Sequence, residues 1–159
     1  MEPLSVSPFA TGDQTTELDG NSSGAASILL IEDNPADVLL VEEALKEYQV
    51  TAEFIVLGDG EKAIRFIEEF DAASAPYPKL VILDLNLPKR NGKDVLRHIR
   101  QSAKWDRIPV VILTSSNTPA DRAEAARLGA NQYIRKPPQL EDFLNIGAVL
   151  KHLIYDLSS

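Results

Sequence analysis

The chain has 159 residues, of which 44% are hydrophobic, and it carries a formal net charge of −8 without any cysteine. This length supports one domain of ordinary size, or one domain with a tail, and the hydrophobic fraction is sufficient for a core. The acidic balance argues against nonspecific nucleic-acid binding, and the lack of cysteine excludes disulfides, thiolate metal sites and cysteine nucleophiles.

The first 27 residues differ in composition from the rest of the chain. Met1–Ser27 is rich in serine, threonine, glycine, proline and acidic residues and has no sustained apolar periodicity. Such a segment cannot bury enough surface to offset its ordering entropy, so it is predicted to be a disordered leader. It also lacks the basic and apolar regions of a signal peptide, and no stretch of the chain approaches the roughly 20 apolar residues that cross a membrane. We therefore expect a cytoplasmic protein that does not enter a membrane.

From Ile28 onward, short apolar runs alternate with helical patterns. The runs are the length of buried strands, and they are Ile28–Ile31, Phe54–Leu57, Leu80–Leu83, Val110–Leu113 and Gln132–Arg135. Helices are expected from Pro35 to about Glu47, after Gly58-Asp59-Gly60, from Lys93 to Arg100, between Thr118-Pro119 and Gly129, and over Gln139–Ile154. Five such units predict an α/β fold with a doubly wound five-stranded parallel sheet and helices on both faces, spanning residues 28–154 and followed by a tail, 155–159.

Polar residues stand at the carboxyl ends of four of these predicted strands. They are Glu32-Asp33, Asp84, Thr114 and Lys136. Because the carboxyl ends of parallel strands gather at one edge of a sheet, we expect these side chains to converge. Crowded carboxylates repel one another unless a cation lies among them, so the arrangement suits a divalent metal and a phosphoryl group.

The same positions carry a family resemblance. It rests on Glu32-Asp33, Asp59-Gly60, Val81–Pro88, Thr114-Ser115, Gly129-Ala130 and Lys136-Pro137, in this order and in these elements. With them, the chain from about Ile28 to Ile154 resembles the receiver domain of bacterial two-component response regulators. The resemblance implies a flavodoxin-like sheet of strand order 2-1-3-4-5. Leu85–Lys89 and Arg107–Ser116 are further similar to the small single-domain regulators that partner phytochrome-type histidine kinases.

The resemblance implies a phosphoacceptor and a magnesium site. Asp84 would be the nucleophile that forms a 4-aspartylphosphate. Mg²⁺ prefers carboxylates, waters and phosphate oxygens, and Asp33, Asp84 and the backbone carbonyl of Asn86 would supply the protein oxygens. Glu32 would act through water, although its longer side chain leaves direct ligation open.

Three further residues would respond to the phosphoryl group. Lys136 would supply a positive charge to its oxygens, aimed by a cis peptide before Pro137. Thr114 would offer a hydroxyl, and Tyr133 would be the aromatic switch that turns inward as Thr114 shifts. These roles imply a two-component phosphorelay protein that a separate histidine kinase phosphorylates. It would not be an enzyme beyond self-catalysed phosphoryl transfer and slow autodephosphorylation. The hydrolysis is expected to be slow because Ser116 is poorly suited to orient an attacking water.

The last predicted helix suggests an interaction surface. At about 100° per residue, one face of it points toward the sheet and contains Leu140, Phe143, Leu144, Gly147, Leu150 and Ile154. Ile146, Val149 and Leu153 then form a second stripe that points outward and would mediate a homodimer. The alternative is that Ile146 only widens the core face.

Two other functions compete with the phosphorylation switch. An aspartate-nucleophile phosphatase would need a second aspartate two residues after Asp84, where this chain has Asn86. A degenerate receiver that serves only as an interaction module would be expected to lack an aspartate, threonine or lysine of the cleft. A DNA-binding domain is not expected, since only five residues follow Ile154.

Overall fold

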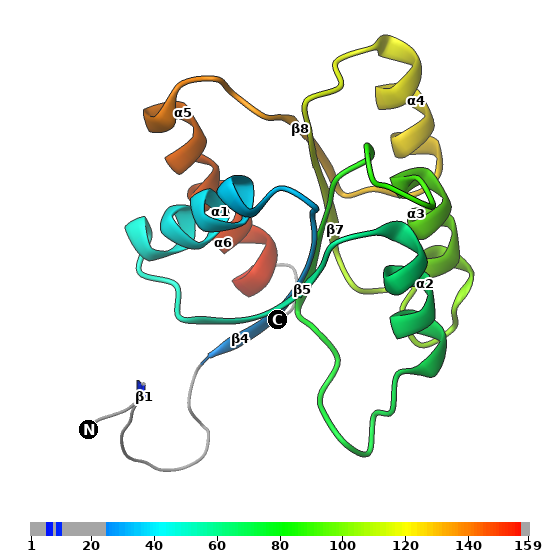
Figure 1. Ribbon diagram of the computed structural model, residues 1–159, viewed down its shortest axis with the longest axis horizontal. Helices are drawn as coiled ribbons and strands as arrows, with labels where there is room; N and C mark the ends of the chain where they lie inside the picture. Colours follow the sequence, from blue (N-terminus) through cyan, green and yellow to red (C-terminus); the bar gives the residue numbers. More distant parts are fainter. Residues whose placement is uncertain (1–5, 8, 11–24, 157–159) are drawn as a thin grey trace.

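The computed structural model describes residues 6–7, 9–10 and 25–156 of the chain (Figure 1). Its main sheet has five parallel strands in the order β5-β4-β6-β7-β8. The strands are β4 (Ala26–Ile31), β5 (Ala52–Leu57), β6 (Leu80–Leu83), β7 (Val110–Thr114) and β8 (Gln132–Arg135). Numbered within this sheet, the order is 2-1-3-4-5, which confirms the predicted flavodoxin-like topology.

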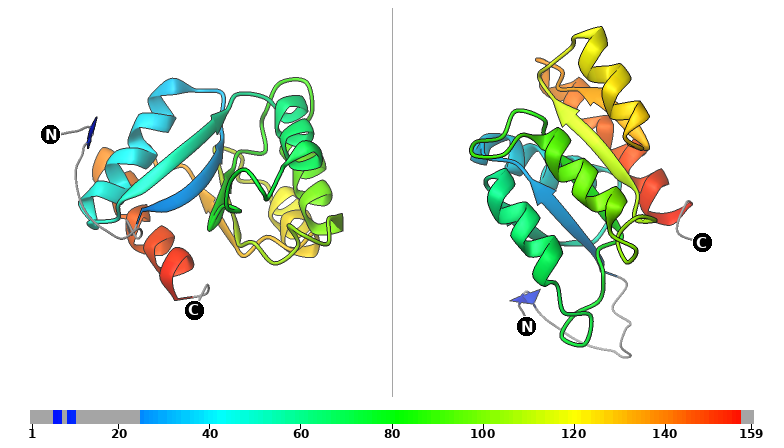
Figure 2. Two further views of the ribbon diagram at one scale, coloured as in Figure 1. Left: turned by 90° about the horizontal axis from the view of Figure 1, so that it is seen from below. Right: turned by 90° about the vertical axis from the view of Figure 1, so that its right-hand side faces the viewer.

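Helices cover both faces of the sheet (Figures 1 and 2). One face carries α1 (Pro35–Glu47), α5 (Leu140–Leu144) and α6 (Ile146–Tyr155). The other face carries α2 (Gly60–Glu69), α3 (Gly92–Gln101) and α4 (Pro119–Arg127). This three-layer arrangement explains why the central strands β4, β6 and β7 are almost continuously apolar and buried, as parallel strands covered on both faces must be.

Alternation along the strands divides the core into two clusters. In β4, Ile28 and Leu30 pack on the side of α1 and α6, while Leu29 and Ile31 pack on the side of α2 and α3. Successive side chains of a strand point to opposite faces, so each face receives every second residue. Each fully buried aliphatic side chain stabilises the fold by about 1.5–3 kcal/mol relative to an exposed one. This burial holds the sheet rigidly, and it therefore also fixes the positions of the residues that come directly after the carboxyl ends of the strands.

Four of the helices begin with a side-chain cap immediately after a strand or its loop. Asn34, Asp59, Asn91 and Thr118 each accept a hydrogen bond from a backbone N–H in the first turn of α1, α2, α3 and α4. Such a cap contributes about 1 kcal/mol by satisfying an N–H that has no partner within the helix. Since the strands are parallel, all four helix starts lie at the carboxyl edge of the sheet.

The prediction for the last helix is wrong in two respects. The helix is interrupted at Asn145, giving α5 and α6 instead of one helix over Gln139–Ile154. Ile146 and Leu153, predicted to point outward, are only 5% and 2% exposed, whereas Leu140, predicted to face the sheet, is 59% exposed. The reason is that α6 packs against α1 as well as the sheet, so its buried face is broader than periodicity suggests.

The approach of α6 to α1 is close enough to require a glycine. A Cβ atom on Gly147 would collide with the backbone oxygen of Ala44 and with the ring of Tyr48. The hydroxyl of Tyr48 donates a hydrogen bond to Oδ1 of Asn145 at 3.3 Å, at the break between α5 and α6.

Val149 is partly exposed and is the one member of the predicted outward stripe that is not buried.

The structure differs from the sequence prediction at the start of the sheet and at one peptide bond. Ala26 and Ser27 belong to β4, so this strand starts two residues before the predicted Ile28. Within the predicted disordered leader, the structure describes β1 (Val6–Ser7) and β2 (Phe9–Ala10), which pair in antiparallel fashion. The rest of the leader up to residue 24 (residues 1–5, 8 and 11–24) and residues 157–159 of the predicted tail lie outside the described residues. No cis peptide occurs in the described part of the chain, so the predicted cis bond before Pro137 is wrong. No described helix is long and apolar enough to cross a membrane.

Candidate functional site

The predicted convergence of polar side chains at the strand ends is present. Glu32 follows β4, Asp84 follows β6, Thr114 ends β7 and Lys136 follows β8. Glu32, Asp84 and Thr114 are buried, and Asp33 beside them is exposed. A buried carboxylate is rare unless it is paired or bound to a cation, so the charges that compensate these carboxylates are expected in Lys136 and in the space between them.

Three of these carboxylates are arranged to share a metal ion. Glu32, Asp33 and Asp84 each offer an oxygen, and these oxygens lie within 4.8 Å of one another. The donor set consists of oxygen atoms alone, which suits a hard divalent cation such as Mg²⁺ or Mn²⁺. The residues therefore fit the predicted metal, with Asp33 on the solvent side and the other two in the interior.

Lys136 holds the carboxylates together in the structure. Its ammonium lies 2.8 Å from Glu32 Oε1, 2.9 Å from Asp84 Oδ2 and 2.8 Å from Asp37 Oδ2. Asp37, in the first turn of α1, was not predicted from the sequence to be part of the site. The available signal was its position four residues after Asp33 at a helix start that faces the cleft, but an acidic residue there is common because it also complements the helix dipole.

Burial and charge act against each other on the ionisable groups. Burial alone would lower the pKa of Lys136, but the hydrogen bonds that its ammonium donates to Asp37, Glu32 and Asp84 outweigh burial and raise the pKa above its ordinary value. Burial raises the pKa of Glu32, and the nearby Asp84 raises it further, although the hydrogen bond from Lys136 opposes this. The cleft therefore keeps its lysine charged and has more negative charge than one lysine can balance.

The loop after Asp84 is folded tightly around that residue. The backbone N–H of Asn86 donates to Asp84 Oδ1 at 3.0 Å, and the N–H of Gly92 donates to Leu85 O at 2.9 Å. A Cβ atom on Gly92 would collide with the backbone oxygen of Asp84, so only glycine permits this approach. Lys89, within the loop, has a positive φ of 72°. The Asp84 carboxylate is thereby oriented by its own loop as well as by Lys136.

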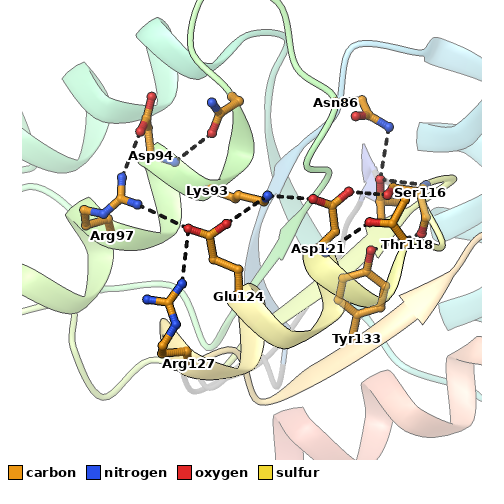
Figure 3. A network of polar contacts seen from close by, with 12 residues as sticks. Asn86, Lys93, Asp94, Arg97, Ser116, Thr118, Asp121, Glu124, Arg127 and Tyr133 are labelled. Atoms are coloured by element: carbon orange, nitrogen blue, oxygen red, sulfur yellow. Dashed lines mark hydrogen bonds and ion pairs between the residues drawn. The ribbon is translucent and has the colours of Figure 1, made fainter.

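A second set of polar contacts runs from Asn86 and Ser116 toward α3 and α4 (Figure 3). The Thr114 hydroxyl oxygen accepts hydrogen bonds at 3.4 Å from the side-chain amide of Asn86 and from the backbone N–H of Ser116. The Ser116 hydroxyl donates to Asp121 on α4, whose carboxylate also lies 2.6 Å from the ammonium of Lys93 on α3. The cleft is thus connected by polar contacts to the surface between two helices.

Tyr133 lies on β8 next to this set of contacts. Its hydroxyl donates a hydrogen bond to the backbone oxygen of Ser116 at 3.0 Å (Figure 3 shows the ring beside Ser116). The guanidinium of Arg122 lies 4.5 Å from the centre of the ring. Tyr133 therefore contacts the loop that follows Thr114.

The amino-acid sequence matches a known family over most of the domain. Residues 28–146 match the family described as the response regulator receiver domain. Response regulator Rcp1 of Synechocystis sp. is 41% identical over 120 residues, which cover 75% of this chain and 82% of that protein. The probable methanogenesis regulatory protein FilR2 of Methanothrix harundinacea is 36% identical over 115 residues, which cover 72% of this chain and 74% of that protein.

Solved structures agree with these matches. The phosphorylated cyanobacterial phytochrome response regulator RcpA superposes with a TM-score of 0.76 at 34% identity, covering 85% of this chain and 97% of that chain. The Mn²⁺-bound form of response regulator Rcp1 superposes with a TM-score of 0.73 at 37% identity, covering 84% of this chain and 96% of that chain. Both the fold and the sequence are therefore shared over nearly the whole length of these relatives.

Proposed function

The chain belongs to the response regulator receiver domain family, and we propose that Asp84 is its phosphoacceptor. A receiver is a signalling switch, which agrees with the prediction made from the sequence. The observation that carries the assignment is the position of Asp84: its carboxylate is buried at the end of a central strand and receives hydrogen bonds from Lys136 and from the backbone N–H of Asn86. A carboxylate held in this way is oriented for in-line attack on phosphorus.

The proposed reaction transfers a phosphoryl group from a phosphohistidine of a separate kinase. An oxygen of Asp84 forms a bond to phosphorus while the nitrogen–phosphorus bond breaks and its electron pair returns to the imidazole of the donor. Lys136 contributes a fixed positive charge beside the carboxylate that attacks. Thr114 offers a buried hydroxyl at the neighbouring strand end, within the same cleft.

Mg²⁺ is the proposed metal, held by Asp33 and Asp84 with the backbone carbonyl of Asn86, and by Glu32 directly or through water. Support comes from the oxygen-only cluster of Glu32, Asp33 and Asp84, and from a relative, Rcp1, whose solved structure contains Mn²⁺. When bound, such an ion would neutralise charge on the phosphoryl oxygens. It would also relieve the repulsion among carboxylates that Lys136 balances only in part.

The partner is proposed to be a histidine kinase of the phytochrome type, in the cytoplasm. The similarity to RcpA, a cyanobacterial phytochrome response regulator, supports this choice. Nucleic acid is not a proposed partner, because the chain has a net charge of −8. The alternatives considered from the sequence are not favoured: every residue expected of an active cleft is present, and Asn86 stands where a phosphatase would need its second aspartate.

Phosphorylation is proposed to switch an interaction surface through Thr114 and Tyr133. The added charge at one strand end favours an arrangement in which Thr114 turns toward the phosphoryl group. Tyr133 contacts the loop after Thr114 and would sense that change. A homodimer is retained as a proposal, but it requires a surface other than the predicted stripe, because Ile146 and Leu153 are buried.

Phosphorylation with a small donor tests the assignment of Asp84. Incubation with acetyl phosphate and Mg²⁺ should add the mass of one phosphoryl group to the intact protein. Asp84→Asn and EDTA should each abolish this addition, while Asp142→Asn, which changes an exposed aspartate on α5, should leave it unchanged. Efficient labelling of the Asp84→Asn protein would show that the phosphoacceptor is another residue.

A further inference from the structure

Among the residues that the structure describes, Asp37 is the one carboxylate in contact with Lys136 that lies outside the metal cluster. The cluster found among the described residues consists of Glu32, Asp33 and Asp84. Asp37 comes from a different element, the first turn of α1, and its Oδ2 lies 2.8 Å from the Lys136 ammonium. Its side chain is 18% exposed, so it lies at the rim of the cleft and not at its base.

We propose that Asp37 is a positioning residue that holds Lys136 at the phosphoryl site before and after transfer to Asp84. This inference rests on the proposed function and adds a residue to it. An ammonium has three N–H donors, and here the three carboxylates of Glu32, Asp37 and Asp84 are all within hydrogen-bond distance. A phosphoryl oxygen can therefore bind Lys136 only by replacing one of them.

The contact that is replaced follows from the chemistry of the reaction. When Asp84 becomes an acyl phosphate, its carboxylate loses its negative charge, and the charge moves to the phosphoryl oxygens. Lys136 then exchanges its bond to Asp84 for a bond to a phosphoryl oxygen, while its bonds to Glu32 and Asp37 persist. Because Glu32 also belongs to the metal cluster, Asp37 is the anchor of Lys136 that the metal does not share.

The anchor is fixed by the way in which α1 begins. Asn34 caps the helix: its side chain accepts from Ala36 N at 2.9 Å, and its backbone oxygen accepts from Val38 N at 3.1 Å. Val41 and Leu45, further along α1, are buried in the core below the cleft. Asp37 therefore extends from a rigid element, whereas Lys136 has a long flexible stem whose free motion would otherwise have to be restricted when the phosphoryl group arrives.

The test is the affinity of the protein for beryllofluoride, a mimic of the phosphoryl group, measured by calorimetry in saturating Mg²⁺. Asp37→Ala should weaken the affinity about tenfold or more, as expected for loss of a hydrogen bond to a charged group. Asp37→Asn keeps an oxygen that accepts from Lys136 and should remain within about threefold of wild type. Glu43→Ala, which removes an exposed carboxylate from the same helix, should have no effect.

A second background separates positioning from a general effect on α1. In a protein that carries Lys136→Met, or Lys136→Gln if the first variant does not fold, Asp37→Ala should cause no further loss of affinity. A loss that persists without the lysine would mean that Asp37 acts through helix stability, and equal losses in Asp37→Ala and Asp37→Asn would mean that its charge alone matters. Either result overturns the inference, as does an Asp37→Ala protein with the affinity of wild type.

The same experiment distinguishes failure of this inference from failure of the proposed function. If wild type does not bind beryllofluoride in the presence of Mg²⁺, then the assignment of a phosphoacceptor cleft is at fault. If wild type binds it and Asp37→Ala binds equally well, then the cleft is correct and only the role of Asp37 is wrong. Separate Mg²⁺ titrations of the variants exclude a change in metal affinity as the cause.

Discussion

Two lysines of this protein bridge carboxylates at nearly the same distances but in different surroundings. Lys136 contacts three carboxylates at 2.8–2.9 Å, and its side chain is 13% exposed. Lys93, between α3 and α4, lies 2.6 Å from Asp121 and 3.0 Å from Glu124 and is 25% exposed (Figure 3). The distance between ammonium and carboxylate therefore says little about the role of an ion pair, because the exposure of the two groups to solvent determines how strongly they interact.

Solvent affects the two clusters through the cost of burial and through screening. Hydrogen bonds to Asp121 and Glu124 raise the pKa of Lys93, with little opposition from burial. Burial by itself would lower the pKa of Lys136, and hydrogen bonds to three carboxylates outweigh it. Removing one partner from a buried cluster leaves charges without compensation, whereas an exposed partner is replaced by water.

The largest expected effect follows from removing Lys136, the less exposed of the two lysines. Lys136→Met should lower the free energy of unfolding of the metal-free protein by about 3 kcal/mol, because it leaves the carboxylates of Glu32, Asp37 and Asp84 without a cation. Urea unfolding monitored by circular dichroism measures the change. Saturating Mg²⁺ should restore part of the loss. If the metal-free variant is as stable as wild type, then the lysine is not what balances this cluster.

The second largest effect concerns metal binding by the two acidic clusters. At a hundredfold excess over its dissociation constant, Mg²⁺ should stabilise the wild-type protein by about 2.7 kcal/mol, because it binds the folded state and not the unfolded chain. Asp33→Asn should remove most of this stabilisation. Asp121→Asn, in the more exposed cluster around Lys93, should retain it. Equal loss in both variants would contradict a site confined to the cleft.

A smaller effect is expected on the lifetime of the phosphorylated protein. The Ser116 hydroxyl is engaged by Asp121 and is a weak acceptor, so wild-type phosphoprotein should hydrolyse slowly. Ser116→Glu should shorten the lifetime several-fold, because its carboxylate can accept a strong hydrogen bond from the attacking water and is repelled by Asp121 toward the cleft. Loss of the phosphoryl mass with time measures the rate. Ser116→Ala is the control, and an unchanged rate in Ser116→Glu would refute the argument.

The smallest effect is expected from Lys93, the more exposed of the two lysines. Lys93→Met should change the free energy of unfolding by about 0.5 kcal/mol or less, and the difference should shrink further in 1 M salt, where exposed charges are screened. Its response to beryllofluoride should match that of wild type. If Lys93→Met alters the affinity for beryllofluoride more than threefold, the contacts from Lys93 through Asp121 and Ser116 to Thr114 carry coupling, and the two clusters are not independent.

The parts of this fold and site that could be predicted are those decided by local patterns. Short apolar runs indicated the five strands, of which Leu80–Leu83 and Gln132–Arg135 have the predicted bounds. Asn34-Pro35 and Thr118-Pro119 marked helix starts correctly because capping depends on neighbouring residues alone. Parallel strands end at one edge, so the convergence of Asp84, Lys136 and their neighbours follows from the order of elements.

What the sequence alone could not determine depends on which element covers which face. Periodicity placed Ile146 and Leu153 on one side of the last helix, but only the position of α1 beside α6 shows that this side is buried. Asp37 and Lys136 are 99 residues apart, and their ion pair exists because α1 starts at the rim of the cleft. Sequence patterns describe the faces of single elements, whereas the partner of each face is chosen by packing among all of them, through contacts that no local pattern contains.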